Sequence, residues 1–97
     1  MPEPMPADQI NTALQDLPGW SFADDKLHKA YSFGSFKEAM SFMVRVGFEA
    51  EALGHHPELF NVYSTVKIAL NTHDAGGKVT ELDVKLAGAI ESFAWTG

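Results

Sequence analysis

Apolar residues recur at helical spacing in three stretches of the chain, and each stretch predicts an amphipathic helix. The first is short, ends at a Pro-Gly pair, and has its apolar positions at Ile10, Leu14 and Leu17. The second begins with a capping box, in which Ser35 precedes Glu38 by three residues, and stops at Gly54. Its apolar positions are Phe36, Met40, Met43, Val46, Ala50 and Leu53. The third begins with a capping box of Thr80 and Asp83 and continues through Leu86, Ile90 and Phe93.

Two stretches between these helices alternate apolar and polar residues, as strands with one buried face do. The first predicts a β-hairpin with its turn at Asp24-Asp25, and one face of its second strand carries Leu27, Lys29, Tyr31 and Phe33. The second stretch, residues 60–73, is rich in β-branched residues and predicts one or two strands with a turn near Ser64.

The order helix, two strands, helix, two strands, helix predicts an α+β fold of two layers, with helices packed on one face of a four-stranded antiparallel sheet. The other face is left open for solvent or a partner subunit. A chain of 97 residues is long enough for one hydrophobic core, so residues 1–97 are expected to form a single domain. Residues 1–6, which are rich in proline, are expected to form a mobile tail.

Composition narrows the functional classes. The chain has no cysteine, which excludes disulfides, thiolate zinc sites and cysteine nucleophiles and favours a reducing, cytoplasmic location. The formal charge is −6 and no Lys/Arg cluster is present, so nucleic acid is not an expected partner. No segment approaches the roughly 20 apolar residues of a membrane helix, so no membrane association is expected either.

The histidines are the best candidates for chemistry. His55 and His56 follow the long predicted helix, and His73 ends a predicted strand. Imidazoles titrate near neutral pH, so several of them in one cleft suit general acid and base catalysis, although any one alone is more often an ordinary polar residue. His28 lies opposite the apolar stripe of its strand and is expected to be an exposed strand residue.

A metal site is the competing interpretation, because His55, His56, His73 and Asp74 offer ligands suited to zinc. Adjacent histidines in an extended segment point apart, and no helical HExxH spacing is present, so no metal is expected.

Two carboxylates are candidates to assist the histidines. Asp83 caps a predicted helix, and the second oxygen of its carboxylate is available to orient an imidazole. Glu51 lies four residues before His55, near a helix C-terminus, where the helix dipole disfavours an acid. This unfavourable position indicates a use for Glu51 other than helix stabilisation.

Larger motifs resemble a known family. The central segment is Glu51-Ala-Leu-Gly-His55-His56-Pro57-Glu58, followed by Asn61-Val-Tyr63, Val66, Thr72-His73, Gly77 and Thr80-x-x-Asp83-x-x-x-Ala87. Upstream, the match extends through Gly19-Trp20 and Phe33-x-x-Phe36-x-x-Ala39-x-x-Phe42-Met43. Over nearly the whole chain this spacing resembles the pterin-4a-carbinolamine dehydratases, known in animals also as a dimerisation cofactor of a homeodomain transcription factor.

The resemblance implies a hydro-lyase. Its substrate would be the 4a-hydroxytetrahydropterin that an aromatic amino acid hydroxylase leaves behind, and its products quinonoid dihydropterin and water. Such a lyase recycles tetrahydrobiopterin during phenylalanine hydroxylation. The resemblance also implies the sheet-and-helix architecture predicted above, a dimer or tetramer, and no metal or other cofactor.

Carried over position by position, the family's catalytic histidines fall on His55, His56 and His73, and its associated carboxylate falls on Asp83. The resemblance implies that His55 and His73 reach the 4a-hydroxyl as general acids, that His56 holds the pterin ring and that Asp83 orients an imidazole. Glu51 matches a family position near the site.

Three features depart from the family pattern. Gly54 stands where an acidic residue often precedes the histidine pair, and Leu59 stands where the animal proteins have tryptophan. The loop between His73 and Asp83 is one residue longer than in the animal form. The rival interpretation is a non-catalytic, coactivator-like module that dimerises or binds another protein, and the presence of all three histidines favours the enzyme.

Overall fold

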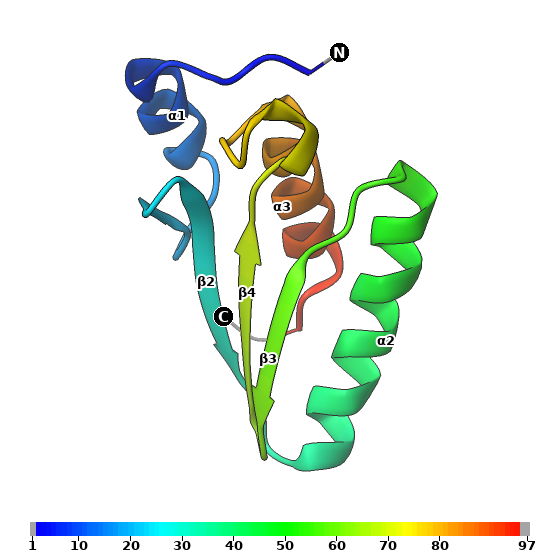
Figure 1. Cartoon of the computed structure of the whole chain (residues 1–97). Coiled ribbons are helices and arrows are strands. Elements are labelled where there is room, and N and C mark those ends of the chain that lie inside the picture. The colour runs from blue at the N-terminus through cyan, green and yellow to red at the C-terminus, as the bar shows by residue number, and fades with distance from the viewer. Residues whose placement is uncertain (1, 96–97) are drawn as a thin grey trace.

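A computed structural model of the protein describes residues 2–95 (Figure 1). Residue 1 of the expected tail and residues 96–97 of the expected domain lie outside the described residues. The elements are α1 (Ala7–Leu14), β1 (Ser21–Ala23), β2 (Lys26–Ser32), α2 (Phe36–Leu53), β3 (Glu58–Val62), β4 (Thr65–Leu70), a 3-10 helix η1 (His73–Ala75) and α3 (Glu81–Phe93). The predicted α+β order is confirmed, with two strands and a turn where one or two strands were expected.

The four strands form one antiparallel sheet in the order β1-β2-β4-β3. Pairing of Tyr31 with Val66 and of Leu27 with Leu70 directs these four side chains into the core against the helices. Figure 1 shows α3 behind the sheet and α2 beside β3. Among the described residues no helix is long and apolar enough to cross a membrane.

Local sequence signals explain most element ends. The hairpin turn has φ of 53° at Asp24 and 61° at Asp25, the pair of positive angles that a two-residue type I′ turn requires and that Asp tolerates. The first helix ends at Leu14, earlier than predicted, and the buried Leu17 lies in the turn that follows. Leu17 therefore fills the core without being helical.

The prediction of which face of α2 is buried is partly wrong. Phe36 and Met40 are 47% and 42% exposed, and the side chains that enter the core are Ala39, Phe42, Val46 and Ala50. The cause is a second apolar stripe on the same helix, spaced every four residues, which a 3.6-residue period fits almost as well. Its members are Phe36, Met40, Val44 and Phe48.

Contacts in the structure modify the expectations for His28 and for the N-terminal segment. His28 lies on the open face of the sheet but is half-buried, and a ring nitrogen hydrogen-bonds to the carbonyl of Ala23 in the neighbouring strand. In the N-terminal segment, the N–H of Met5 donates to the carbonyl of Val79 at 2.8 Å, and its side chain packs against the core. The mobility of residues 1–6 stays a prediction.

An ion pair between the buried Lys29 and the half-buried Glu91 joins the sheet to the C-terminal half of α3. Nζ of Lys29 lies 2.8 Å from Oε2 of Glu91, and it also donates to the carbonyl of Pro18 at 2.6 Å. The hydroxyl of Tyr31 and the indole of Trp20 donate to the same carboxylate oxygen. This explains how a lysine can occupy the apolar face of β2, since its charge is paired and hydrogen-bonded.

The same contacts set the ionisation of this cluster. Burial by itself raises the pKa of Glu91, and the hydrogen bonds from Lys29 and Tyr31 outweigh that effect, so the pKa lies below its ordinary value. Burial, and then the hydrogen bond to Glu91, raise the pKa of Tyr31. Glu91 is therefore negative and Tyr31 neutral at physiological pH.

Gly54 and Gly88 form a matched pair for testing the backbone. Gly54→Ala is expected to destabilise the protein by about 1 kcal/mol, because Gly54 has φ of 62°. Gly88→Ala, inside α3 where an added Cβ meets nothing within 4 Å, is expected to stabilise it by up to about 1 kcal/mol. Urea unfolding followed by circular dichroism measures both changes in the free energy of unfolding. If both variants were stabilised, or both destabilised, the backbone conformations assigned to Gly54 and Gly88 would be contradicted.

Acid sensitivity tests the ion pair. Glu91→Gln is expected to cost about 2 kcal/mol at pH 7, because it leaves Lys29 buried and unpaired. The contribution of Glu91 is present above the unfolded-state pKa of 4.5 and lost as the pH falls through the lower folded-state pKa. The stability difference between wild type and variant should therefore shrink below pH 4.5.

Urea titrations from pH 7 to pH 3 measure this difference. Glu49→Gln is the control, because the pair of Arg45 and Glu49 is exposed and should contribute less than about 0.5 kcal/mol. If the stability difference between wild type and Glu91→Gln stayed constant with pH, the stabilising role of the ion pair between Lys29 and Glu91 would be contradicted.

Candidate active site

The end of α2 turns His55 into the protein. Gly54 adopts the left-handed conformation, and its N–H donates to the carbonyl of Glu51. The N–H of His55 donates to the carbonyl of Ala50 at 3.0 Å. These two bonds form a Schellman motif, which reverses the chain after the helix. As a result the His55 residue is only 7% exposed.

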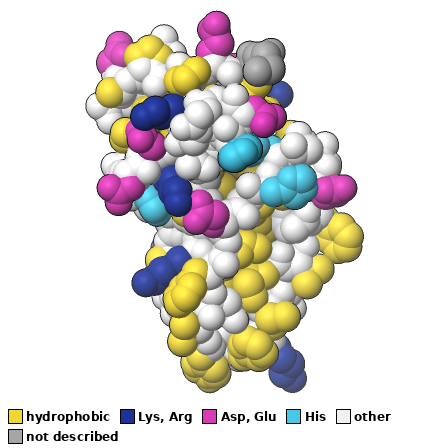
Figure 2. Space-filling view, in the orientation of Figure 1, with side chains coloured by type: hydrophobic (Ala, Val, Ile, Leu, Met, Phe, Trp, Pro, Cys, Tyr) yellow, Lys and Arg dark blue, Asp and Glu magenta, His cyan; other side chains and the backbone are white. Residues whose placement is uncertain are grey.

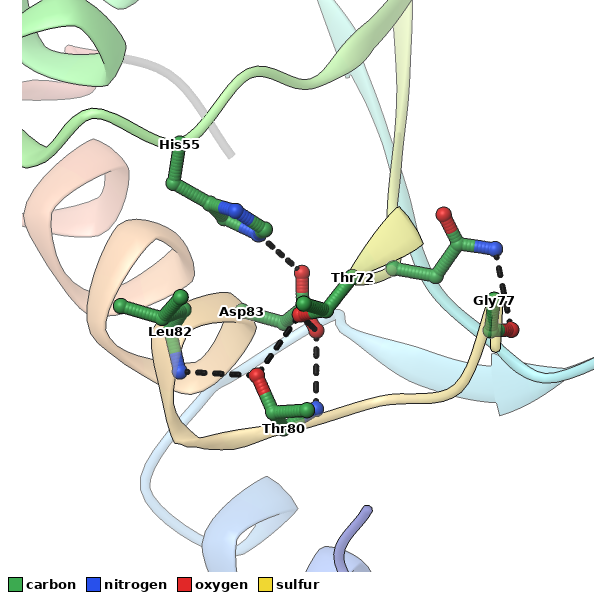
Figure 3. Close-up of polar contacts among 7 residues, drawn as sticks. His55, Thr72, Gly77, Thr80, Leu82 and Asp83 are labelled. Atoms are coloured by element: carbon green, nitrogen blue, oxygen red, sulfur yellow. Dashed lines mark hydrogen bonds and ion pairs between the residues drawn. The ribbon is translucent and has the colours of Figure 1, made fainter. Parts of the chain in front are cut away.

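The imidazole of His55 meets a buried carboxylate (Figure 3). Its Nε2 lies 2.5 Å from Oδ1 of Asp83, which is fully buried at the start of α3. The other oxygen, Oδ2, accepts from the N–H of Thr80 and from the hydroxyl of Thr72, each at 2.8 Å. The carboxylate accepts at both oxygens, which places a hydrogen on Nε2 of His55.

The other ring nitrogen of His55, Nδ1, is not fully buried. Nδ1 has no hydrogen bond within residues 2–95, and no fully buried side-chain nitrogen or oxygen in that range lacks a partner. A histidine held at one nitrogen by a buried carboxylate, with its second nitrogen accessible, can give or accept a proton there. The carboxylate stabilises the imidazolium form during such a transfer.

His56 points the other way, as expected for adjacent residues in an extended segment. Its Nε2 lies 2.8 Å from Oε1 of Glu51, in the last turn of α2. Both side chains are largely exposed, so their pairing adds little to stability. The structure thus gives Glu51 a contact with a site histidine, which accounts for an acid at the C-terminal end of a helix.

His73 is exposed at the start of η1, next to the hydroxyl network of Asp83. The residue before it, Thr72, accepts backbone hydrogen bonds from Ala75 and Gly77, each at 3.1 Å. Gly77 has φ of 74°, which lets the loop close tightly. The loop leaves Asp83 in contact with His55.

The site residues divide into contacting pairs. His55 contacts Asp83, His56 contacts Glu51, and His73 adjoins the first pair through the chain. Figure 2 shows histidine and acidic side chains close together on the upper half of this face. Within residues 2–95 no group of three or more His, Asp or Glu side chains could hold a metal ion.

Thr72 was missed as a site residue. Its only sequence signal was its place in the Thr72-His73 motif, which says nothing about where the hydroxyl points. The structure shows that the hydroxyl is buried against Asp83 and Thr80. Because these contacts join the end of β4 to the start of α3, only the folded chain reveals them.

Comparison with known proteins agrees with this architecture. Residues 3–93 match the family described as pterin 4 alpha carbinolamine dehydratase. A protein of Opitutus terrae named as a pterin-4-alpha-carbinolamine dehydratase is 56% identical, with all of both chains covered. A protein of Rhizobium johnstonii with the same name is 49% identical, over 91% of this chain and 88% of the relative.

Solved structures share the fold. The crystal structure of a transcriptional coactivator/pterin dehydratase from Brucella melitensis has a TM-score of 0.87 and 36% identity, covering 92% of this chain and 96% of that one. A pterin dehydratase-like RuBisCO assembly factor of the alpha-carboxysome, 22% identical with a TM-score of 0.63, shares the fold alone. By sequence over nearly its whole length and by fold, this chain belongs to the pterin-4-alpha-carbinolamine dehydratase family of hydro-lyases.

Proposed function

We propose that this protein dehydrates a 4a-hydroxytetrahydropterin to quinonoid dihydropterin by histidine general acid and base catalysis. The observation that carries the proposal is the contact between His55 and the buried Asp83, which leaves Nδ1 accessible. Family membership supplies the class of reaction and substrate. The site geometry supports the roles proposed for individual residues.

The reaction asks little of the protein. The lone pair of the ring nitrogen next to C4a expels the 4a-oxygen, which takes a proton from an imidazolium and leaves as water. The resulting cation then gives up its nitrogen-bound proton to an imidazole, so the enzyme ends in its starting state. One well-placed imidazole, stabilised as a cation by a carboxylate, can perform both transfers.

The three histidines have different parts in this proposal. His55 donates through Nδ1 to the departing oxygen, with Asp83 holding its Nε2 hydrogen. His73, exposed on the adjoining loop, is the second general acid or base. His56 contacts the pterin ring, and its bond to Glu51 fixes the orientation of its imidazole.

The substrate implies the metabolic setting. A 4a-hydroxytetrahydropterin is formed when an aromatic amino acid hydroxylase uses its pterin cofactor, so the protein would serve tetrahydrobiopterin recycling in phenylalanine hydroxylation. We place this activity in the cytoplasm, because a chain without cysteine needs no oxidising compartment.

Replacing the histidines tests the catalytic roles. His55→Gln keeps a hydrogen-bond donor toward Asp83 but cannot transfer a proton, so kcat should fall at least about 100-fold. His73→Ala should also lower kcat, and His56→Ala should mainly raise KM. The rate of dehydration of 4a-hydroxytetrahydropterin, generated by a phenylalanine hydroxylase, measures each effect.

His28→Ala is the matched control, because His28 lies on the open face of the sheet, where it bonds to Ala23. It should keep wild-type activity. A wild-type protein that does not accelerate dehydration would overturn the proposed function. A His55→Gln variant with full activity would overturn only the role of His55.

We also infer that the protein self-associates through one edge. Ten large apolar side chains are exposed among residues 2–95, and eight of them form two neighbouring groups that we call the apolar edge. One group is the outer stripe of α2, and the other lies on β3 and its following turn. The members are Phe36, Met40, Val44, Phe48, Leu59, Phe60, Val62 and Tyr63.

The sheet topology supports a second copy of the chain as the occupant. β3 is an edge strand, so one row of its backbone donors and acceptors lacks a strand partner among residues 2–95. Antiparallel pairing of β3 with β3 of another copy would satisfy that row and bury the apolar edge symmetrically. Figure 2 shows hydrophobic side chains covering the lower part of this side of the molecule.

A charge introduced at the edge tests the self-association. Val62 is 60% exposed on β3, so Val62→Lys should turn a dimer or tetramer into a monomer. Sedimentation velocity at micromolar concentration measures the assembly. Ala30→Lys, in β2 and separated from β3 by β4, should leave the assembly unchanged. A monomeric wild-type protein would contradict the inference.

The non-catalytic module remains a distinct outcome. Two results together would favour that module. The wild type would show no dehydration, and a variant that lacks His55, His56 and His73 would still assemble. Substitutions at different residues thus test assembly and catalysis separately.

A further inference from the structure

We propose that Thr72 is a positioning residue, which fixes the pair of His55 and Asp83 relative to the loop that carries His73. The proposal rests on the function proposed above. Thr72 is only 4% exposed and lies between β4 and η1, at the meeting point of both parts of the site. Its hydroxyl hydrogen-bonds to Asp83, and its backbone forms hydrogen bonds within the loop that carries His73.

The hydroxyl belongs to a chain of hydrogen bonds with one possible direction. The N–H of Leu82 donates to Oγ1 of Thr80 at 3.2 Å. The two threonine hydroxyls lie 2.7 Å apart, and Oγ1 of Thr72 lies 2.8 Å from Oδ2 of Asp83. A carboxylate can only accept, and a hydroxyl has one hydrogen. Thr72 therefore donates to Asp83, and Thr80 donates to Thr72 (Figure 3).

This direction fixes the rotation of the Asp83 carboxylate. Oδ2 is held by two donors, the hydroxyl of Thr72 and the N–H of Thr80, so Oδ1 is left to face Nε2 of His55. Hydrogen bonds to a charged acceptor are short and strong. Without the donor from Thr72, one bond to Thr80 would hold the carboxylate, and the imidazole would lose part of its orientation.

The backbone of the same residue closes the catalytic loop. The carbonyl of Thr72 accepts from Ala75 and Gly77, and its N–H donates to the carbonyl of Lys78 at 2.8 Å. His73 is the next residue, so its Cα position follows from these bonds. A single residue thus connects the segment of His73 with the carboxylate that orients His55.

Only the hydroxyl of Thr72 is needed for the hydrogen bond to Asp83. Substitutions can therefore separate the effect of the side chain's shape from the effect of its hydrogen-bond donor. Thr72→Val keeps the size and branching of the side chain and removes the donor. Thr72→Ser keeps the donor and removes a methyl group. Thr72→Cys leaves a weak donor. Thr65→Val is the matched control, because Thr65 lies in the same β4 strand at its other end, paired with Ser32 and away from Asp83.

The first measurement is independent of activity. In protein labelled with ¹⁵N-histidine, the Nε2-bound hydrogen of His55 should give a slowly exchanging NMR signal, identified by its loss in His55→Gln. We expect fast exchange or loss of this signal in Thr72→Val, retention in Thr72→Ser and Thr65→Val, and an intermediate effect in Thr72→Cys. Should Thr72→Val not fold, the comparison of cysteine with serine carries the test.

The second measurement is the split between kcat and KM. Thr72→Val should lower kcat about tenfold, the factor expected for one hydrogen bond to a charged group. KM should stay within about twofold, because Thr72 is buried and its hydroxyl donates to Asp83. Thr72→Ser should restore kcat.

The outcomes are distinguishable. An unchanged ring signal in a folded Thr72→Val variant, or a Thr72→Ser variant as impaired as valine, would overturn the role of Thr72. A lost ring signal in Thr72→Val with no dehydration by the wild type would support the positioning role and overturn the proposed function alone.

Discussion

The buried carboxylate of Asp83 is the interaction on which the site and its surroundings depend. A fully buried charge is costly unless each oxygen is hydrogen-bonded. Here the donors come from three segments: His55 after α2, Thr72 after β4, and Thr80 before α3. Satisfying one carboxylate therefore brings together the ends of two helices and a strand. The cap that begins α3 is also the support for the imidazole.

Two carboxylates, the buried Asp83 and the half-buried Glu91, hold α3 at both ends. Asp83, near the N-terminus of α3, joins it to α2 and β4, and Glu91, near its C-terminus, joins it to β2 through Lys29. Removing either partner would leave a charge in an apolar setting, which is more costly than the lost contact itself. The helix layer is thus fixed to the sheet at two distant points. The β3 edge carries no such constraint and remains available for assembly.

The sequence predicted what depends on local interactions. Capping boxes, turn residues and alternation act within a few positions, so the order of elements, the turn at Asp24 and Asp25, and the stop at Gly54 could be predicted. The inner face of α2 could not be, because its two apolar stripes differ by a small rotation of the helix. Packing against β4 and α3 decides which stripe is buried and leaves Phe36 and Met40 outside.

For the site, the sequence by itself determined the chemical groups: three histidines and two carboxylates, in a spacing that resembles a dehydratase. It also determined that the adjacent His55 and His56 would diverge, since an extended backbone directs neighbours to opposite sides. Only the tertiary structure decided that His55 turns inward to Asp83 while His56 pairs with Glu51. The reason is that a hydrogen bond between residues 28 positions apart requires α2 and α3 to be packed in one register on the sheet.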